Sequence, residues 1–165
     1  MGFMLALFPV IVLLSLSQNT RPAAVQTLVP QKLVSACAAV TRTDVEEALG
    51  RYLDKGTEQS DSLQSTCDYA GKNGVVTVQI HRLSAELNIP SEIEQLKAAL
   101  PGATVRETEG MGSHAFFLDI PNAGTQLHVI RGSEYYVFVS VLGFGDAAKV
   151  AGAVESIGRK VLARL

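Results

Sequence analysis

The sequence predicts an α+β domain: a single, mostly antiparallel sheet with two to three helices packed on one face. Short alternating segments separated by glycine-containing turns indicate neighbouring antiparallel strands. Other segments carry apolar residues at helical spacing, and residues 135–142 are apolar on both faces, which is typical of a central strand. The predicted order is helix, two strands, helix, three or four strands, helix.

The first half of this domain is predicted to hold a short helix and a hairpin. The segment Thr43-Asp44-Val45-Glu46 has the T-x-x-E form of a capping box, and Gly50 is suited to end the helix that follows. Residues 54–64 are polar and predict a surface loop. Residues 66–70 and 75–82 then form a hairpin, in which the second strand buries one face and exposes the other.

The second half combines two helices with several strands. A helix is expected from Pro90 to Leu100, ended by a Pro-Gly pair. A longer helix is expected from Asp146 to Leu165, with its apolar residues in one stripe. Strands are expected at 103–107, 114–120, 125–131 and 135–142.

The beginning of the chain has the composition of an export signal. Residues 3–16 carry no charge and match the apolar core of a signal peptide in length, which is short for a membrane span. No basic residue precedes this run, so an uncleaved membrane anchor is the alternative. We expect a signal peptide at 1–17, a tether at 18–32 and a single domain at 33–165, in a protein exported to the periplasm, the cell envelope or the extracellular space.

Cys37 and Cys67 are the two cysteines of the chain. In an oxidising compartment an even pair normally closes, so a disulfide is the simplest interpretation. A redox-active pair would favour C-x-x-C spacing, and a zinc site would need more ligands than two distant sulfurs. Val34 to Cys37 resembles a lipobox, but polar residues separate it from the apolar run, so lipidation is not expected.

Several function classes lack support in the sequence. The formal net charge is -2 and no basic run occurs, so nucleic acid is not an expected partner. Residues 143–148 match G-x-G-x-x-[GA], but no second strand follows, so a glycine turn with Asp146 as helix N-cap is expected. Ser113 and His114 are neighbours on one strand and point to opposite faces. We expect neither catalysis nor a cofactor.

Strand alternation predicts a candidate interaction face on the outer side of the sheet. It is more aromatic and apolar than a solvated face requires, so it is expected either to bind a partner or to be covered by residues 54–64 or by a second subunit. A metal site formed by His81, His128 and Asp119 is the alternative. The predicted face comprises His81, Phe117, His128, Ile130 and Tyr136.

Five features together carry a resemblance: Cys37 before a capped helix, Leu49-Gly50 at its end, Ser65-Thr66-Cys67-Asp68-Tyr69 opening a hairpin, Gly110-Met111-Gly112 before an aromatic strand, and Leu127-His128-Val129 before the terminal helix. This arrangement resembles a broad group of small exported bacterial domains that includes many actinobacterial lipoproteins of unknown function. The resemblance implies a disulfide between the two cysteines, an envelope location and no established enzymology.

These observations predict an exported, non-catalytic envelope or extracellular module. Its expected role is to bind a protein or another envelope component through the outer face of its sheet. The alternative is a small metal-dependent enzyme or metal binder that uses the two histidines and the aspartate named above.

Overall fold

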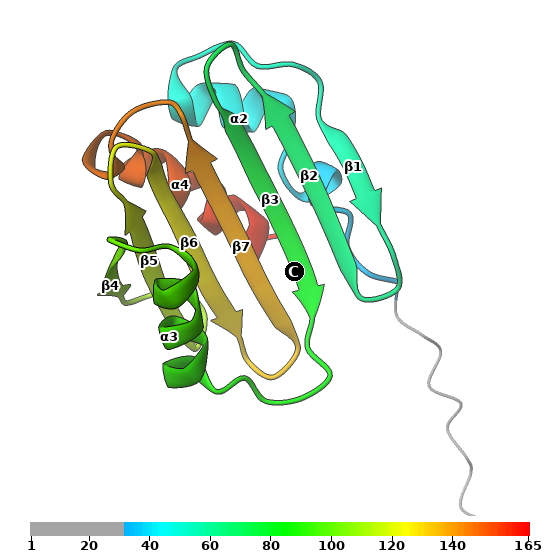
Figure 1. The fold of residues 1–165 in the computed structure, drawn as a ribbon. Coiled ribbons are helices and arrows are strands. Elements are labelled where there is room, and N and C mark those ends of the chain that lie inside the picture. Colours follow the sequence, from blue (N-terminus) through cyan, green and yellow to red (C-terminus); the bar gives the residue numbers. More distant parts are fainter. Residues whose placement is uncertain (1–31) are drawn as a thin grey trace, which may run out of the picture. The chain divides into compact units, whose positions relative to one another are not determined.

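The computed structural model of the protein describes residues 32–165; the predicted signal peptide and all but the last residue of the predicted tether lie outside the described residues. The described chain forms a seven-stranded antiparallel sheet in the order β1-β2-β3-β7-β6-β5-β4 with four helices, so the α+β class is confirmed (Figure 1). The elements are α1 (Ala36–Ala39), α2 (Arg42–Leu49), β1 (Thr57–Ser60), β2 (Gln64–Ala70), β3 (Val75–Arg82), α3 (Ile89–Ala99), β4 (Thr104–Thr108), β5 (His114–Ile120), β6 (Gly124–Arg131), β7 (Tyr135–Leu142) and α4 (Ala147–Leu162).

The last strand, β7, lies in the middle of the sheet, as its composition predicts. It pairs with β3 on one side and with β6 on the other, so that Val139 lies between Val78 and Leu127. A central strand is covered on both faces, and β7 has apolar residues on both. This strand therefore joins the two hairpins into one sheet.

The first predicted helix is present, but its cap lies two residues earlier than expected. Thr41 is the N-cap of α2, and the carboxylate of Asp44 at the third helical position accepts a hydrogen bond from the Thr41 amide. The predicted box at Thr43 and Glu46 is therefore wrong. Glu46 instead accepts a hydrogen bond from the Leu53 amide, at 3.0 Å. Gly50 ends the helix with a left-handed backbone, as predicted.

The predicted loop at 54–64 contains a strand. Residues 57–60 form β1, which pairs antiparallel with β2 at one edge of the sheet. All four residues are exposed, so no alternation of polar and apolar residues marks the strand in the sequence. The loop prediction was wrong because an exposed edge strand needs no apolar face.

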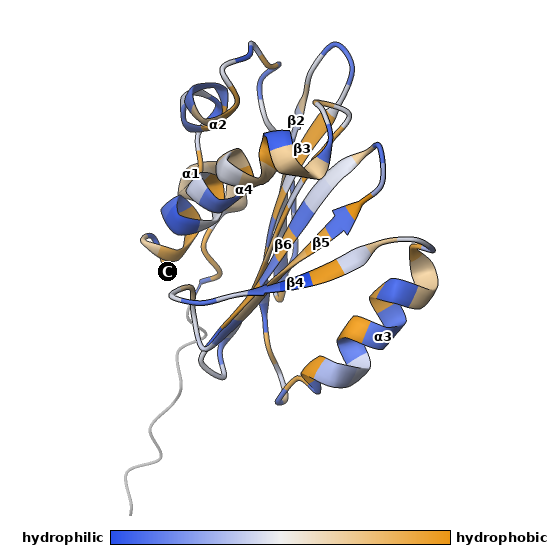
Figure 2. Cartoon of the chain, turned by 90° about the vertical axis from the view of Figure 1, so that its left-hand side faces the viewer, coloured by the Kyte–Doolittle hydropathy of each residue, from blue (hydrophilic) through white to orange (hydrophobic). Residues whose placement is uncertain are grey.

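The helices lie on both sides of the sheet, not on one. Figure 2 shows α1, α2 and α4 on one side, which we call the helix face, and α3 on the other, which we call the outer face. None of the α3 residues is fully buried, whereas α4 buries a stripe that includes Val154, Ile157 and Val161. The expectation of a single helical layer therefore needs correction, because α3 packs separately on the outer face.

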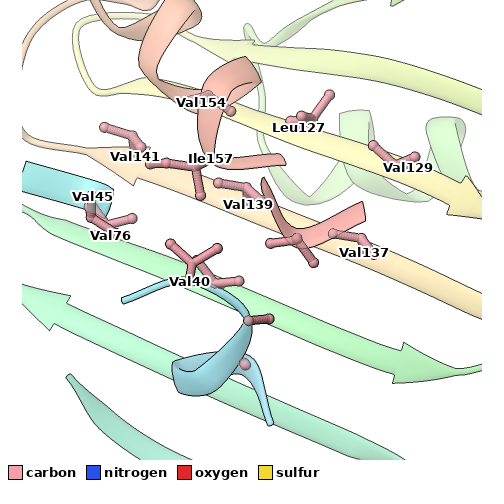
Figure 3. Packing of buried hydrophobic residues seen from close by; sticks show 14 of the residues in the cluster. Val40, Val45, Val76, Leu127, Val129, Val137, Val139, Val141, Val154 and Ile157 are labelled. Carbon is pink, nitrogen blue, oxygen red and sulfur yellow. The ribbon is translucent and has the colours of Figure 1, made fainter. Parts of the chain in front are cut away.

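The main core fills the space between the sheet and the helix face. Figure 3 shows side chains of α2 and α4, including Val45 and Ile157, over the valines of β3 and β7. Residues that alternate along the strands, such as Val76 and Val139, supply the sheet side of this core. None of the described helices is long and apolar enough to cross a membrane.

A disulfide joins Cys37 of α1 to Cys67 of β2, which confirms the predicted bond. The Cα atoms are 5.1 Å apart, within the usual range for a disulfide. The same junction is held by a hydrogen bond of 2.9 Å from the Ala36 amide to the Ser65 hydroxyl. Disulfides persist in oxidising compartments, so this bond is consistent with an oxidising environment.

Candidate binding site

Most of the predicted interaction face is assembled by the fold. Ile130, Tyr136 and His81 are aligned across β6, β7 and β3. His128 lies on the same outer face. It is paired with Phe138 and is therefore the diagonal neighbour of Tyr136. The antiparallel order of the strands therefore brings four of the five predicted residues together.

Phe117 does not belong to this face. It is paired with Leu127 and packs in the core beneath the helix face, where it is 1% exposed. The guanidinium of Arg106 covers its ring at 4.2 Å from the ring centroid. Phe116, its neighbour, points to the outer face instead. Two adjacent phenylalanines offer no polar residue to mark the outward side, so the assignment failed there.

His128 lies in an aromatic cluster on the outer face and is only 1% exposed. Its ring stacks on Phe116 with the ring centroids 4.7 Å apart and meets Phe138 edge-on at 5.2 Å. Its Nδ1 atom is 2.5 Å from the Tyr136 hydroxyl. His128 was predicted to be available to a partner, but its neighbours enclose it almost completely.

Burial determines the protonation of this pair. It lowers the pKa of His128 to about 4, because the charged imidazolium would lose its hydration. Burial also raises the pKa of Tyr136 well above its usual value, and the carboxylate of Glu92 on α3 adds to that rise. Both rings are therefore neutral at pH 7. No hydrogen-bond partner for the Nε2 atom of His128 exists among residues 32–165.

One accessible part of the outer face is a cavity of about 600 Å³ between α3 and the sheet. Ile130 is the residue of the predicted face that reaches it. The opposite wall comes from α3 and the preceding segment. Apolar side chains predominate in the lining, with Glu86, Glu107 and His114 as its ionisable groups. The apolar lining residues are Leu83, Leu87, Ile89, Pro90, Ile93 and Ile130.

A second cavity of about 690 Å³ adjoins the first at the turn between β4 and β5. Glu107, Ser113 and His114 line both cavities. The second is more polar and adds Glu109 and the backbone of Gly110 and Gly112. The two cavities therefore share one boundary, with the apolar cavity under α3 on one side of it and the polar, acidic cavity at the turn on the other.

Two polar residues at the junction differ in their hydrogen bonding. The Ser113 hydroxyl donates to the Ile130 carbonyl oxygen at 3.0 Å, so it is not directed at a histidine. The Nε2 atom of His114 is buried and has no hydrogen-bond partner within the described part of the chain. A buried polar atom without a partner is costly unless a ligand or water satisfies it. His114 therefore lines the junction with an unpaired ring nitrogen that the surrounding protein encloses.

The predicted metal ligands are not brought together. Asp119 lies on the helix face, where its carboxylate accepts a hydrogen bond of 2.6 Å from Thr125 and meets Arg106 at 3.4 Å. His81 and His128 are on the outer face. No group of three His, Cys, Asp or Glu side chains among residues 32–165 is placed to hold a metal ion. The predicted ligand set is wrong because strand alternation separates Asp119 from the histidines.

The sequence also left several cavity residues unassigned. Ile93 was recognised as part of a helical stripe, but that stripe was assigned to the single helical layer. Glu107 and His114 were placed on strands without a role. The sequence shows that these residues are apolar or ionisable. It does not show which side of the sheet α3 covers.

The fold and the cavity define this chain as an α+β sheet protein with a ligand-sized site beneath an outer helix. Comparison with known protein families, curated proteins and solved structures found no match.

Proposed function

We propose that this protein is an exported, non-catalytic module that binds an apolar group of an envelope or extracellular component in the cavity between α3 and the outer sheet face. The observation that carries this proposal is the cavity itself. Its volume lies within the range of small-molecule sites, and its lining is mainly aliphatic. Binding would remove the apolar surfaces of ligand and cavity from water.

The arrangement of α3 supports a binding role. Ile89 and Ile93 remain half-buried instead of packing fully on the sheet, so their apolar surface is available to a ligand. Phe116 and His128 lie on the same outer face and are buried in a packed aromatic pair. A ligand would therefore insert beside α3, on a face that is already packed before binding.

Two further observations support the exported and non-catalytic parts of the proposal. The disulfide between Cys37 and Cys67 favours an oxidising compartment. The Ser113 hydroxyl donates to the backbone and not to the neighbouring His114, so it lacks the base that an activated serine nucleophile requires.

The proposal is tested with an uncharged solvatochromic dye, Nile red, added to the protein without its first 31 residues. Its emission should rise and shift to shorter wavelength on binding. Ile93→Ser should weaken binding by about tenfold, because part of an aliphatic contact of roughly 1.5 to 3 kcal/mol is lost. Gln95→Ser, an exposed change on the same helix, is the matched control and should bind the dye like the unaltered protein.

Circular dichroism establishes that both variants are folded. Absence of dye binding by the unaltered protein would contradict the proposal. Equal binding by Ile93→Ser and Gln95→Ser would also contradict it, because the dye would then bind elsewhere.

A further inference from the structure

We propose that the ligand is a cationic amphiphile, whose aliphatic part lies beneath α3 and whose ammonium group binds Glu107 where the two cavities meet. This inference rests on the proposed function and adds the chemical class of the ligand. It follows from the distribution of apolar and charged side chains along the site.

The apolar end fits an aliphatic chain. Leu87, Ile89 and Ile93 form one wall, and Ile130 of β6 faces them across the cavity. The lining residues of this cavity include no aromatic ring except the imidazole of His114 at its polar end. Branched aliphatic walls give an extended hydrocarbon chain close contacts without a requirement for ring stacking.

The Asp, Glu, Lys and Arg residues that line the two cavities are all glutamates. Arg159 donates to the carbonyl oxygen of Gly110, a lining residue of the second cavity, at 3.3 Å, but it is paired with Glu155 at 2.7 Å. Glu86 and Glu107 line the first cavity, and Glu109 joins Glu107 in the second. Neither lining contains a lysine or an arginine among the residues that the structure describes. The negative field also reaches deeper, since Glu92 of α3 contributes to the raised pKa of Tyr136. A cation complements these carboxylates, whereas an anionic head group would be repelled.

The polar end can also satisfy an ammonium group by hydrogen bonding. Glu107 lines both cavities, so a cation bound to it lies where the apolar cavity meets the polar one. His114 lines both as well, but the surrounding protein encloses its Nε2 atom, which is not exposed to the cavity. An ammonium group has three donors, enough for the Glu107 carboxylate and two water molecules.

This site selects against two related amphiphiles by different means. A fatty acid would place its carboxylate beside that of Glu107, which is exposed, and like charges so placed repel each other. A fatty alcohol would fill the apolar end but would form no ion pair. Affinity should therefore fall from amine to alcohol to acid.

The experiment measures displacement of Nile red by decylamine, decanol and decanoate at neutral pH and below their micelle concentrations. Decylamine is protonated there, as a lysine side chain is. We expect decylamine to displace the dye at a concentration about tenfold lower than decanoate. Decanol should lie between them, and added salt should weaken the binding of decylamine only.

Two variants test the role of Glu107. Glu107→Gln keeps the shape of the side chain and removes its charge, so it should weaken decylamine binding about three- to fivefold and leave decanol unchanged. Glu94→Gln is the matched control, because its side chain is 73% exposed on α3 and pairs with Lys97. It should leave all three ligands unchanged.

The inference is overturned if decanol or decanoate binds as tightly as decylamine, or if Glu107→Gln has no larger effect than Glu94→Gln. In either case continued binding of Nile red would leave the apolar site and the proposed function intact. Failure of the dye itself to bind would contradict both proposals.

Discussion

His128 and Tyr136 lie diagonally across β6 and β7, with Nδ1 of the imidazole 2.5 Å from the phenol oxygen. Phe116 and Phe138 enclose this pair from two sides. The cluster lies on the same outer face as the proposed binding site, so its protonation affects the stability of that face.

Protonation of His128 should make the protein less stable in mild acid. Its pKa falls from 6.5 in an unfolded chain to about 4 in the folded protein. Between these values the unfolded chain binds more protons, so stability is full above about pH 6.5 and decreases toward pH 4. The loss should be about 3 kcal/mol, because each pKa unit corresponds to about 1.4 kcal/mol.

Urea unfolding at a series of pH values measures this loss. His128→Phe removes the titrating group and should flatten the pH dependence between pH 6.5 and 4. Equal slopes for the two proteins would show that His128 does not control this transition.

Removal of the disulfide should destabilise the domain by roughly 3 to 4 kcal/mol. Cys37 and Cys67 are 30 residues apart in sequence, and the bond restricts the unfolded chain over that loop. The double variant Cys37→Ser, Cys67→Ser should unfold at lower urea concentration than the oxidised protein. Reductant should lower the midpoint of the unaltered protein and leave the double variant unaffected; an unchanged midpoint on reduction would contradict this assignment.

Lys160 links the terminal helix to α2 through Asp44, at 2.6 Å, and through Glu47, at 3.4 Å. The hydrogen bond from Lys160 is the main reason that the pKa of Asp44 falls to about 2. Asp44→Ala should cost about 1 to 2 kcal/mol in urea unfolding at pH 7, since it removes both a helix cap and an ion pair.

Glu47→Ala is the matched comparison, because this carboxylate is 68% exposed and should contribute little. Lowering the pH should reduce the difference in the free energy of unfolding between Asp44→Ala and the unaltered protein. The Asp44 contribution is present above pH 3.8, its unfolded value, and is lost as the pH falls toward 2. Similar losses for the two variants at pH 7 would contradict this ranking.

Gly143 should tolerate substitution less well than Gly132, although both have a left-handed backbone, with φ of 82° and 59°. A Cβ atom at Gly143 would lie 2.2 Å from the Asn73 carbonyl oxygen, whereas none of the described atoms lies within 4 Å of one at Gly132. Gly132→Ala should cost about 1 kcal/mol from backbone strain, and Gly143→Ala at least about 3 kcal/mol. Thermal unfolding of the pair measures the difference, and equal costs would show that the turn can move aside.

Local sequence signals located most of the elements of the fold. Gly50 and Asp146 mark helix ends at the positions where the structure has them. The alternation in 75–82 corresponds to a strand buried on one face. These signals succeed because capping and alternation depend on residues that are close in sequence.

The errors concern features that depend on distant partners. The strand β1 is marked only by its pairing with β2, since its own residues are all exposed. Phe117 and Asp119 were assigned to the outer face, but their pairing with β6 places them on the helix face. In a strand with adjacent apolar residues, a shift of one residue reverses every side chain.

The sequence alone determined the α+β class, the central position of β7 and the pairing of two cysteines that an oxidising compartment would join. Only the tertiary structure decided that α3 lies on the outer face and that Glu107, His114 and Ile130 meet beneath it. The physical reason is that an amphipathic stripe specifies that a helix is buried on one side, but not which face of the sheet it covers. The cavity forms because α3 lies over the outer face.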